Sequence, residues 1–290
     1  MKAAVVTRYG PPEVLEVRDV PAPEPGDDDV LVRVHASTVC YGDRMIRRGP
    51  LLVRLLGGVR RPKASILGAD LSGTVVSVGK NVMRFAPGDE VFGSRGEKFG
   101  GYAEFACVAQ NGFLAKKPAT ITLEEAAPVF VGGVCGPANV GLVRSLGADT
   151  VIDYTKDDFT RDGPIYDVIC DVMGKSGFPA SLRALRPRGR YLLIGFSGGL
   201  LAIAGALLSG AWTHLRGRAA FIAGPARPVQ ADLEFLKTLI EAGQLLAVIG
   251  RTFALDDIVA AHRHADTDHK VGNIVVLVDV SSMTPAAPAG

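Results

Sequence analysis

The chain has 290 residues, more than a single hydrophobic core usually serves, so the sequence predicts two domains. A hydrophobic content of 48% with 21% charged residues is typical of a globular protein, and a net charge of only +2 without a basic, aromatic-rich face argues against nucleic-acid binding. The cysteines form no C-x-x-C pair, which argues against a zinc ribbon and favours a reducing compartment; they are Cys40, Cys107, Cys135 and Cys170. Because the first residues lack the apolar core of a signal peptide, we expect a cytoplasmic protein.

The first third of the chain consists of short apolar runs separated by Gly/Pro turns, a pattern that favours a barrel-like β domain. Apolar and polar residues alternate over 30–36, which predicts a half-buried strand, and 71–78 is a second strand rich in β-branched residues. One or two helical turns are expected over 43–49. The other strands predicted here are 2–7, 15–18, 91–93 and 100–108.

A basic segment interrupts this part of the chain. Between Asp43 and Asp70 there is no acidic residue, whereas seven basic residues stand among leucines: Arg44, Arg47, Arg48, Arg54, Arg60, Arg61 and Lys63. Such a segment either attracts a membrane surface or a phosphate group, or forms a loop with a solvated basic face. We favour the loop.

The second part alternates strands and helices, as a parallel nucleotide-binding sheet does. Residues 128–154 combine an apolar strand, a Gly/Pro turn, a short helix and a second strand at 150–154. The dinucleotide fingerprint G-x-G-x-x-G is absent, and its nearest match, Gly133-x-x-Gly136, lacks one glycine. Further strands are expected at 166–172, 191–195 and 272–278, helices at 180–185, 232–242 and 256–264, and a frayed tail at 281–290.

Residues 191–213 carry no charge over a length sufficient to span a bilayer. The alternative is a buried strand followed by a Gly-rich turn and an apolar helix from about Leu200. Five glycines interrupt the segment, so we favour this alternative and expect no membrane partner.

Eight motifs, in order from Met1 to about Val278, resemble those of one family. They are Gly10-Pro11-Pro12-Glu13-Val14-Leu15, Gly68-Ala69-Asp70-Leu71-Ser72-Gly73, Pro87-Gly88-Asp89-Glu90-Val91, Gly101-Tyr102-Ala103-Glu104, Leu146-Gly147-Ala148-Asp149, Val151-Ile152-Asp153-Tyr154, Tyr166-Asp167-Val168 and Lys270-Val271-Gly272-Asn273. Together they resemble the medium-chain dehydrogenase/reductase superfamily, and within it the zinc-independent quinone oxidoreductase branch.

The resemblance implies an α/β fold with a GroES-like β-barrel catalytic domain and a Rossmann-type parallel sheet. On this basis we expect the catalytic domain at 1–127, a shortened Rossmann-like domain at 128–252 and a C-terminal return to the catalytic domain at 253–280. The implied activity is NADPH-dependent reduction of quinones, enones or other activated carbonyls.

One departure from the family pattern concerns the Rossmann-like domain. Residues 134–154 match the second β-α-β step of the family, not the first, so roughly 40 residues, about one β-α unit and a helix, are expected to be absent. The lost strand would be the central one, and its loss would remove the helix N-terminus that holds the pyrophosphate. Either 129–135 replaces the strand and 136–139 forms a makeshift anion site, or cofactor binding is weak or lost. We favour weak or lost binding.

The candidate catalytic residue is Tyr41, a hydrogen-bond donor for a substrate carbonyl oxygen. The Cys40-x-x-Asp43 spacing is similar to the start of a zinc site, but the family's Gly-His-Glu is Gly68-Ala69-Asp70 here, so the imidazole ligand is missing and we expect no metal.

For the cofactor, no carboxylate follows Val134-Cys135, which favours NADPH over NADH, with Arg144 as a partner for the 2′-phosphate. The cofactor-binding residues predicted here or implied by the resemblance are Gly136, Asn139, Arg144, Tyr154, Gly174, Gly195, Phe196 and Asn273.

We therefore expect a zinc-independent oxidoreductase that transfers a hydride from NADPH to a small-molecule quinone or enone, with its activity reduced if no other segment replaces the missing phosphate loop. The alternative is a non-catalytic relative that acts as a binding or structural protein. A homodimer is left open.

Overall fold

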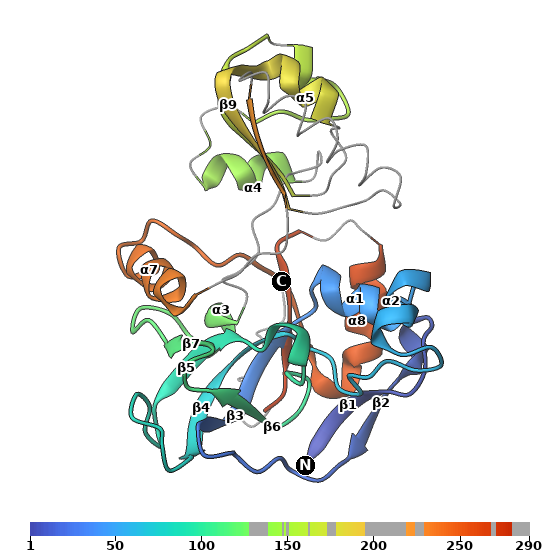
Figure 1. Cartoon of the computed structure of the whole chain (residues 1–290), viewed down its shortest axis with the longest axis vertical. Helices are drawn as coiled ribbons and strands as arrows, with labels where there is room; N and C mark the ends of the chain where they lie inside the picture. The colour runs from blue at the N-terminus through green and yellow to red at the C-terminus, as the bar shows by residue number, and fades with distance from the viewer. Residues whose placement is uncertain are drawn as a thin grey trace, which may run out of the picture. The chain divides into compact units, whose positions relative to one another are not determined.

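The structure, a computed structural model, describes residues 1–127, 139–146, 148, 151–161, 163–172, 178–194, 219–223, 229–267 and 271–279. The chain forms two compact units (Figure 1). Unit 1 contains Met1–Val131 and Pro228–Gly290, and unit 2 contains Gly132–Arg227. The C-terminal part of the chain thus completes the unit that the N-terminal part begins.

Unit 1 is organised around one long strand, β3 (Asp29–Thr38). It pairs in antiparallel fashion with β4 (Asp70–Val78), β6 (Phe105–Ala109) and β12 (Asn273–Leu277). The seven-stranded sheet has the order β11-β12-β3-β4-β5-β7, with β6 added on β3. Its other strands are β5 (Glu90–Ser94), β7 (Phe113–Lys116) and β11 (Ile249–Ala254), and a separate hairpin joins β1 (Lys2–Val6) to β2 (Leu15–Asp19).

Five α-helices of unit 1 lie in the described part of the chain: α1 (Tyr41–Arg48), α2 (Leu51–Gly57), α3 (Leu123–Ala126), α7 (Gln230–Glu241) and α8 (Ile258–Asp266). Helix α1 ends at Gly49, whose φ of 60° is the left-handed conformation that favours glycine. The interpretation of the basic segment as a loop is wrong for 51–57, because its leucines are strong helix formers that follow a proline.

Unit 2 contains a parallel sheet of β8 (Tyr166–Asp171), β9 (Leu185–Leu193) and β10 (Ala219–Ala223) in that order. Helix α5 (Phe178–Ala184) connects β8 to β9, and the rings of Phe178, Tyr191 and Phe221 pack in one core. A short helix, α4 (Val140–Ser145), precedes the sheet. Parallel strands in chain order form one wing of a doubly wound sheet, as the predicted Rossmann-type fold requires.

The predicted strand at 150–154 is wrong for its described residues. Residues 151–153 have no regular secondary structure, and Tyr154 begins a turn. A strand exists only through the hydrogen bonds of a neighbour, and 151–154 pair with no strand that the structure describes. The other strand of this pair was expected within 128–135, and residues 128–138 lie outside the described residues.

Strand β9 starts six residues earlier than predicted, at Leu185 instead of Tyr191. It passes through Pro187, and the pairing of β9 with β8 shifts register between Tyr166 and Val168. Arg188 takes a positive φ of 67° in this irregular stretch. The strand therefore tolerates a proline where its ladder is already interrupted.

No helix in the described part of the chain is long and apolar enough to cross a membrane. Of the apolar segment 191–213, residues 191–193 belong to β9, and 195–213 lie outside the described residues, as does the tail from 280 onward.

Candidate active site and its surroundings

A group of buried polar residues gathers where β3 ends and α1 begins. Asp43, in the first turn of α1, is fully buried and its carboxylate accepts hydrogen bonds from the backbone N–H of Cys40 and of Gly68, both at 2.9 Å. Gly68 has a φ of +85°, and a Cβ there would come within 2.6 Å of the Tyr102 ring. Only glycine therefore allows this backbone to approach the carboxylate.

Asp70, the first residue of β4, is 7% exposed and lies beside Asp43. The Thr38 hydroxyl donates to its Oδ2 at 3.1 Å, and the Ser37 hydroxyl donates to its backbone oxygen at 2.6 Å. Burial raises the pKa of Asp70 to about 6, with the charge of Asp43 acting in the same direction, although hydrogen bonds from Ser94 and Thr38 oppose the rise.

Burial also keeps the neighbouring groups neutral. It raises the pKa of the Tyr102 hydroxyl and of the Cys40 thiol well above their usual values, and the nearby carboxyl of Asp43 adds to both shifts. The protonated Tyr102 hydroxyl donates to the Thr38 carbonyl at 3.0 Å. We call Cys40, Asp43, Asp70 and Tyr102 the acid cluster.

Both carboxylates of the acid cluster already accept hydrogen bonds within the protein, Asp43 from the N–H of Cys40 and Gly68 and Asp70 from the Thr38 hydroxyl. In the described part of the chain, no group of three or more His, Cys, Asp or Glu side chains is placed to hold a metal ion. From the sequence, Cys40, Asp43 and Asp70 were considered only as remnants of a zinc site, and the buried pair of carboxyl groups, Asp43 and Asp70, was missed. The signal for this pair was that Cys40-x-x-Asp43 and Gly68-Ala69-Asp70 each end in an aspartate.

Tyr41, the predicted catalytic donor, is the first residue of α1 and follows Cys40 of the acid cluster directly. Its side chain is 52% exposed. The hydroxyl is therefore accessible to a ligand.

The predicted cofactor residues do not form one group in the described structure. Asn139 caps α4, and its buried side-chain oxygen has no hydrogen-bond partner among the described residues; Arg144, near the end of the same helix, is exposed. Tyr154 is 67% exposed in a turn. Asn273 is buried in β12, where its side-chain nitrogen donates to the Val248 carbonyl at 3.1 Å. Gly136, Gly174, Gly195 and Phe196 lie outside the described residues.

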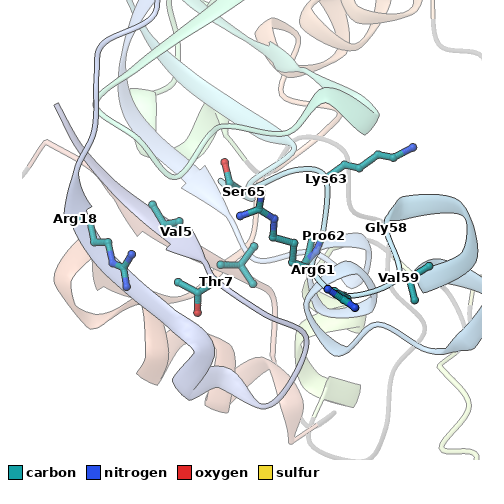
Figure 2. A pocket seen from close by; sticks show the side chains of 11 residues that line it. Val5, Thr7, Arg18, Gly58, Val59, Arg61, Pro62, Lys63 and Ser65 are labelled. Carbon is teal, nitrogen blue, oxygen red and sulfur yellow. The ribbon is translucent and has the colours of Figure 1, made fainter.

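Unit 1 also contains a basic cavity of about 750 Å³, which lies between the β1–β2 hairpin and the loop that follows α2 (Figure 2). Its lining includes four basic residues, Arg18 of β2 and Arg60, Arg61 and Lys63 of the loop. None of its lining residues is acidic.

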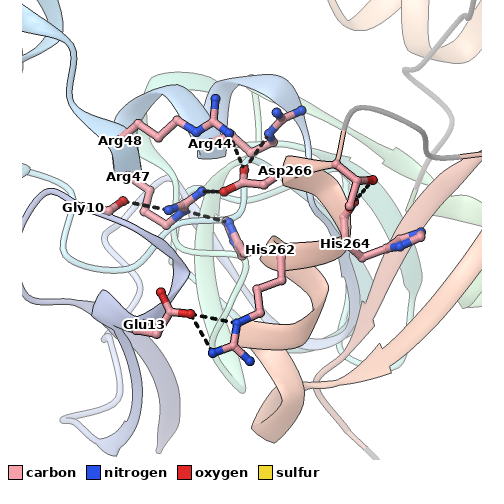
Figure 3. A network of polar contacts seen from close by, with 10 residues as sticks. Gly10, Glu13, Arg44, Arg47, Arg48, His262, His264 and Asp266 are labelled. Carbon is pink, nitrogen blue, oxygen red and sulfur yellow. Dashed lines mark hydrogen bonds and ion pairs between the residues drawn. The ribbon is translucent and has the colours of Figure 1, made fainter.

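Helix α1 is anchored to α8 by a network of arginines around Asp266 (Figure 3). The fully buried guanidinium of Arg47 donates to Asp266 at 2.6 Å, to His262 Nδ1 at 3.2 Å and to the Gly10 carbonyl at 2.7 Å. Arg44 and the half-exposed Arg48 contact the same carboxylate at 3.0 and 3.2 Å. Because α1 also carries Tyr41 and Asp43, this network anchors the helix on which these two site residues lie.

Two family models match the chain. The alcohol dehydrogenase GroES-like domain matches residues 26–119, and the zinc-binding dehydrogenase model matches residues 146–276. A quinone oxidoreductase of Pseudomonas aeruginosa is 28% identical over 93% of this chain and 97% of its own length. An NADPH-dependent alkenal/one oxidoreductase of Arabidopsis thaliana is 27% identical over 95% of this chain and 79% of its length.

Solved structures agree with the predicted fold class. The quinone oxidoreductase from Coxiella burnetii superposes with a TM-score of 0.80 over 96% of this chain and 99% of its own, at 24% identity. The alignment with the Pseudomonas protein extends over 326 positions although this chain has 290 residues, so the relative contains stretches without a counterpart here. The order of the two matched domains and the agreement along nearly the whole chain confirm the predicted α/β architecture. The chain belongs to the medium-chain dehydrogenase/reductase superfamily, in the branch that resembles zinc-independent quinone oxidoreductases.

Proposed function

We propose that the protein is a zinc-independent reductase that transfers a hydride from NADPH to a quinone, an enone or another activated carbonyl. The observation that carries this proposal is the acid cluster. At the position of the zinc enzymes' motif, the structure has buried side chains held by hydrogen bonds, with the Asp43 carboxylate accepting from the backbone N–H of Cys40 and of Gly68. Its similarity to a quinone oxidoreductase and an alkenal/one oxidoreductase supports the substrate class.

Reduced nicotinamide, when bound, supplies the hydride, and a proton from water completes the two-electron reduction. The protein then has to orient the acceptor and stabilise the charge that develops on its oxygen. Tyr41 is suited to this task, because its exposed hydroxyl sits on a helix start that the fully buried Asp43 holds in place. We assign cofactor contacts to Gly136, Asn139, Arg144, Tyr154, Gly174, Gly195, Phe196 and Asn273.

Replacing Tyr41 with phenylalanine is expected to lower kcat by about 100-fold while KM changes little, because only the transition state carries the oxyanion charge. Steady-state kinetics with a quinone and an enone acceptor would measure this. The control is Tyr154→Phe, another exposed tyrosine hydroxyl, which is assigned to the cofactor and should act on the KM for NADPH. Equal kcat for wild type and Tyr41→Phe would remove the residue from the mechanism.

Cofactor binding is the direct test of the reductase. We expect NADPH to bind more weakly than it does to relatives with the full fingerprint, and Arg144→Ala to weaken NADPH while leaving NADH unaffected, because only NADPH has a 2′-phosphate. Isothermal calorimetry on the folded protein gives both constants. The absence of binding at millimolar NADPH, in a sample that melts cooperatively, would rule out the reductase.

A binding or structural role is the second candidate. It is favoured by one observation, that 151–154 pair with no described strand although their sequence predicts one. A protein of this kind would fold cooperatively, would not bind NADPH and would show no turnover. The calorimetric measurement of NADPH binding therefore separates the two candidates.

A further inference from the structure

Two leucines of the basic segment are exposed on one side of α2. Leu51 and Leu55, four residues apart on α2, are 75% and 65% exposed, and Val59 in the following loop is 69% exposed. Residues at this spacing lie on one face of a helix. Single exposed apolar residues are ordinary, but Leu51 and Leu55 form a strip on one face of α2, and Val59 adds a third exposed apolar side chain in the loop that follows the helix.

Cations follow this strip directly in the chain. Arg60 and Arg61 come immediately after Val59, both are exposed, and neither forms an ion pair with a residue that the structure describes. Together with Lys63 and Arg18, which is itself paired with Glu16, they line the basic cavity.

The loop that carries these cations is held in place by the body of unit 1. The Lys63 N–H donates to the Gly57 carbonyl at 2.8 Å, the Val6 N–H donates to the Ser65 carbonyl at 2.7 Å, and the Tyr9 hydroxyl donates to the Gly58 carbonyl at 2.6 Å. Within the loop, Pro62 is buried. The cations are therefore presented on a fixed backbone, at a lower entropic cost of binding than a mobile tail would have.

An apolar strip followed by exposed cations such as Arg60 and Arg61 is the arrangement that binds the surface of an anionic membrane, because the apolar side chains enter the acyl boundary and the cations meet the lipid phosphates. We propose that Leu51, Leu55 and Val59, with the basic cavity beside them, form a docking surface for an anionic lipid bilayer. This surface is independent of the proposed reductase activity. The charge of the segment, without an acidic residue from 44 to 69, favours an anionic surface over a neutral or basic one, and the exposed apolar side chains beside it favour a lipid bilayer.

Vesicle sedimentation tests the proposal, with pure phosphatidylcholine compared with phosphatidylcholine containing 30% phosphatidylglycerol. Wild-type protein is expected to bind the anionic vesicles preferentially and to lose binding as salt rises. At about 1 kcal/mol for each basic residue near the surface, Arg60→Ala/Arg61→Ala should lower the partition coefficient about 30-fold. Leu51→Ser/Leu55→Ser should lower it at least about tenfold.

Matched controls remove the same charge or the same apolar exposure elsewhere. Lys80→Ala/Lys156→Ala takes away two exposed cations, and Met83→Ser takes away a side chain that is 90% exposed; both should bind vesicles as wild type does. Equal binding of the wild type to the two vesicle types would overturn the proposal. A second pair of results would also overturn it: soluble pyrophosphate binds in a way that depends on Arg60 and Arg61, and Leu51→Ser/Leu55→Ser leaves vesicle binding unchanged. Those results would indicate a site for a free phosphate ligand.

Discussion

Replacing Arg47 with alanine is expected to lower the free energy of unfolding by about 2–5 kcal/mol, because a fully buried side chain leaves a cavity and buried acceptors lose their donor. His262 Nδ1 and the Gly10 carbonyl lose the Arg47 guanidinium, whereas Asp266 keeps Arg44 and Arg48. Burial opposes the charge on Asp266, but the hydrogen bonds and charges of Arg47, Arg48 and Arg44 outweigh it and hold the pKa of Asp266 below its usual value. Urea unfolding followed by circular dichroism gives the difference.

Arg48→Ala is the matched control, since Arg48 contacts the same carboxylate at 3.2 Å with its side chain about half exposed. Exposed ion pairs contribute about 0–1 kcal/mol, so this variant should stay close to wild type. The two variants remove the same charge from the same helix and differ in burial. If both lose the same small amount of stability, the network does not anchor α1 to α8.

Arg47 also shows what the sequence could not predict. The run of basic residues indicated a solvated face, yet Arg47 is fully buried because Asp266 and His262 of α8 reach it. These partners are more than 200 residues away in the chain, and no local pattern contains them. Charge patterning therefore described the exposed arginines of the segment correctly and was wrong for Arg44 and Arg47, which are buried and contact Asp266.

The same distinction separates the strands that were predicted from those that were missed. Strand β3 was predicted because its alternating pattern is visible within the segment itself. The short strands β7, β10 and β11 were missed, and β11 exists because it pairs with β12, which in turn pairs with β3. Residues 151–154 show the opposite case. Their side chains favour a strand, but they form none in the structure, because no described segment pairs with them.

For the candidate site, the sequence indicated Tyr41 and the motifs Cys40-x-x-Asp43 and Gly68-Ala69-Asp70. It did not indicate that Asp43 and Asp70 would lie close together and be buried. Asp70 acquires its raised pKa because the fold buries its carboxyl and places the charge of Asp43, on α1, near it, while the hydrogen bond from Thr38 opposes the rise. Residue types can be read from a motif, whereas burial is a property of the assembled fold.

Replacing Asp70 with asparagine is expected to raise the free energy of unfolding by up to about 3 kcal/mol at pH 8. The folded pKa of about 6 lies above the ordinary value of 3.8, so the folded state binds the proton more tightly and loses stability as pH rises from about 3.8 to about 6. Asparagine is neutral at every pH and keeps an oxygen that accepts from Thr38. The advantage of Asp70→Asn should therefore vanish below about pH 4.

This effect has to be measured as a difference between variant and wild type, because His262 changes stability in the opposite direction over nearly the same range. Burial, with the charge of Arg47, lowers the pKa of His262 to about 3, so the folded state resists protonation and gains stability as pH rises from about 3 to 6.5. In the wild type the two contributions oppose each other. Subtracting the wild-type profile leaves the contribution of Asp70 alone.

Asp89→Asn supplies a control of opposite sign. Despite some burial, the pKa of Asp89 is lowered by hydrogen bonds from Lys116 and the Ala86 N–H, so its neutral variant should be less stable at pH 8. A carboxylate retained at a cost in stability is expected at a site selected for function. Asp70→Asn should accordingly combine higher stability with lower turnover, and a variant that is less stable than wild type at pH 8 would show that the fold itself uses the charge of Asp70.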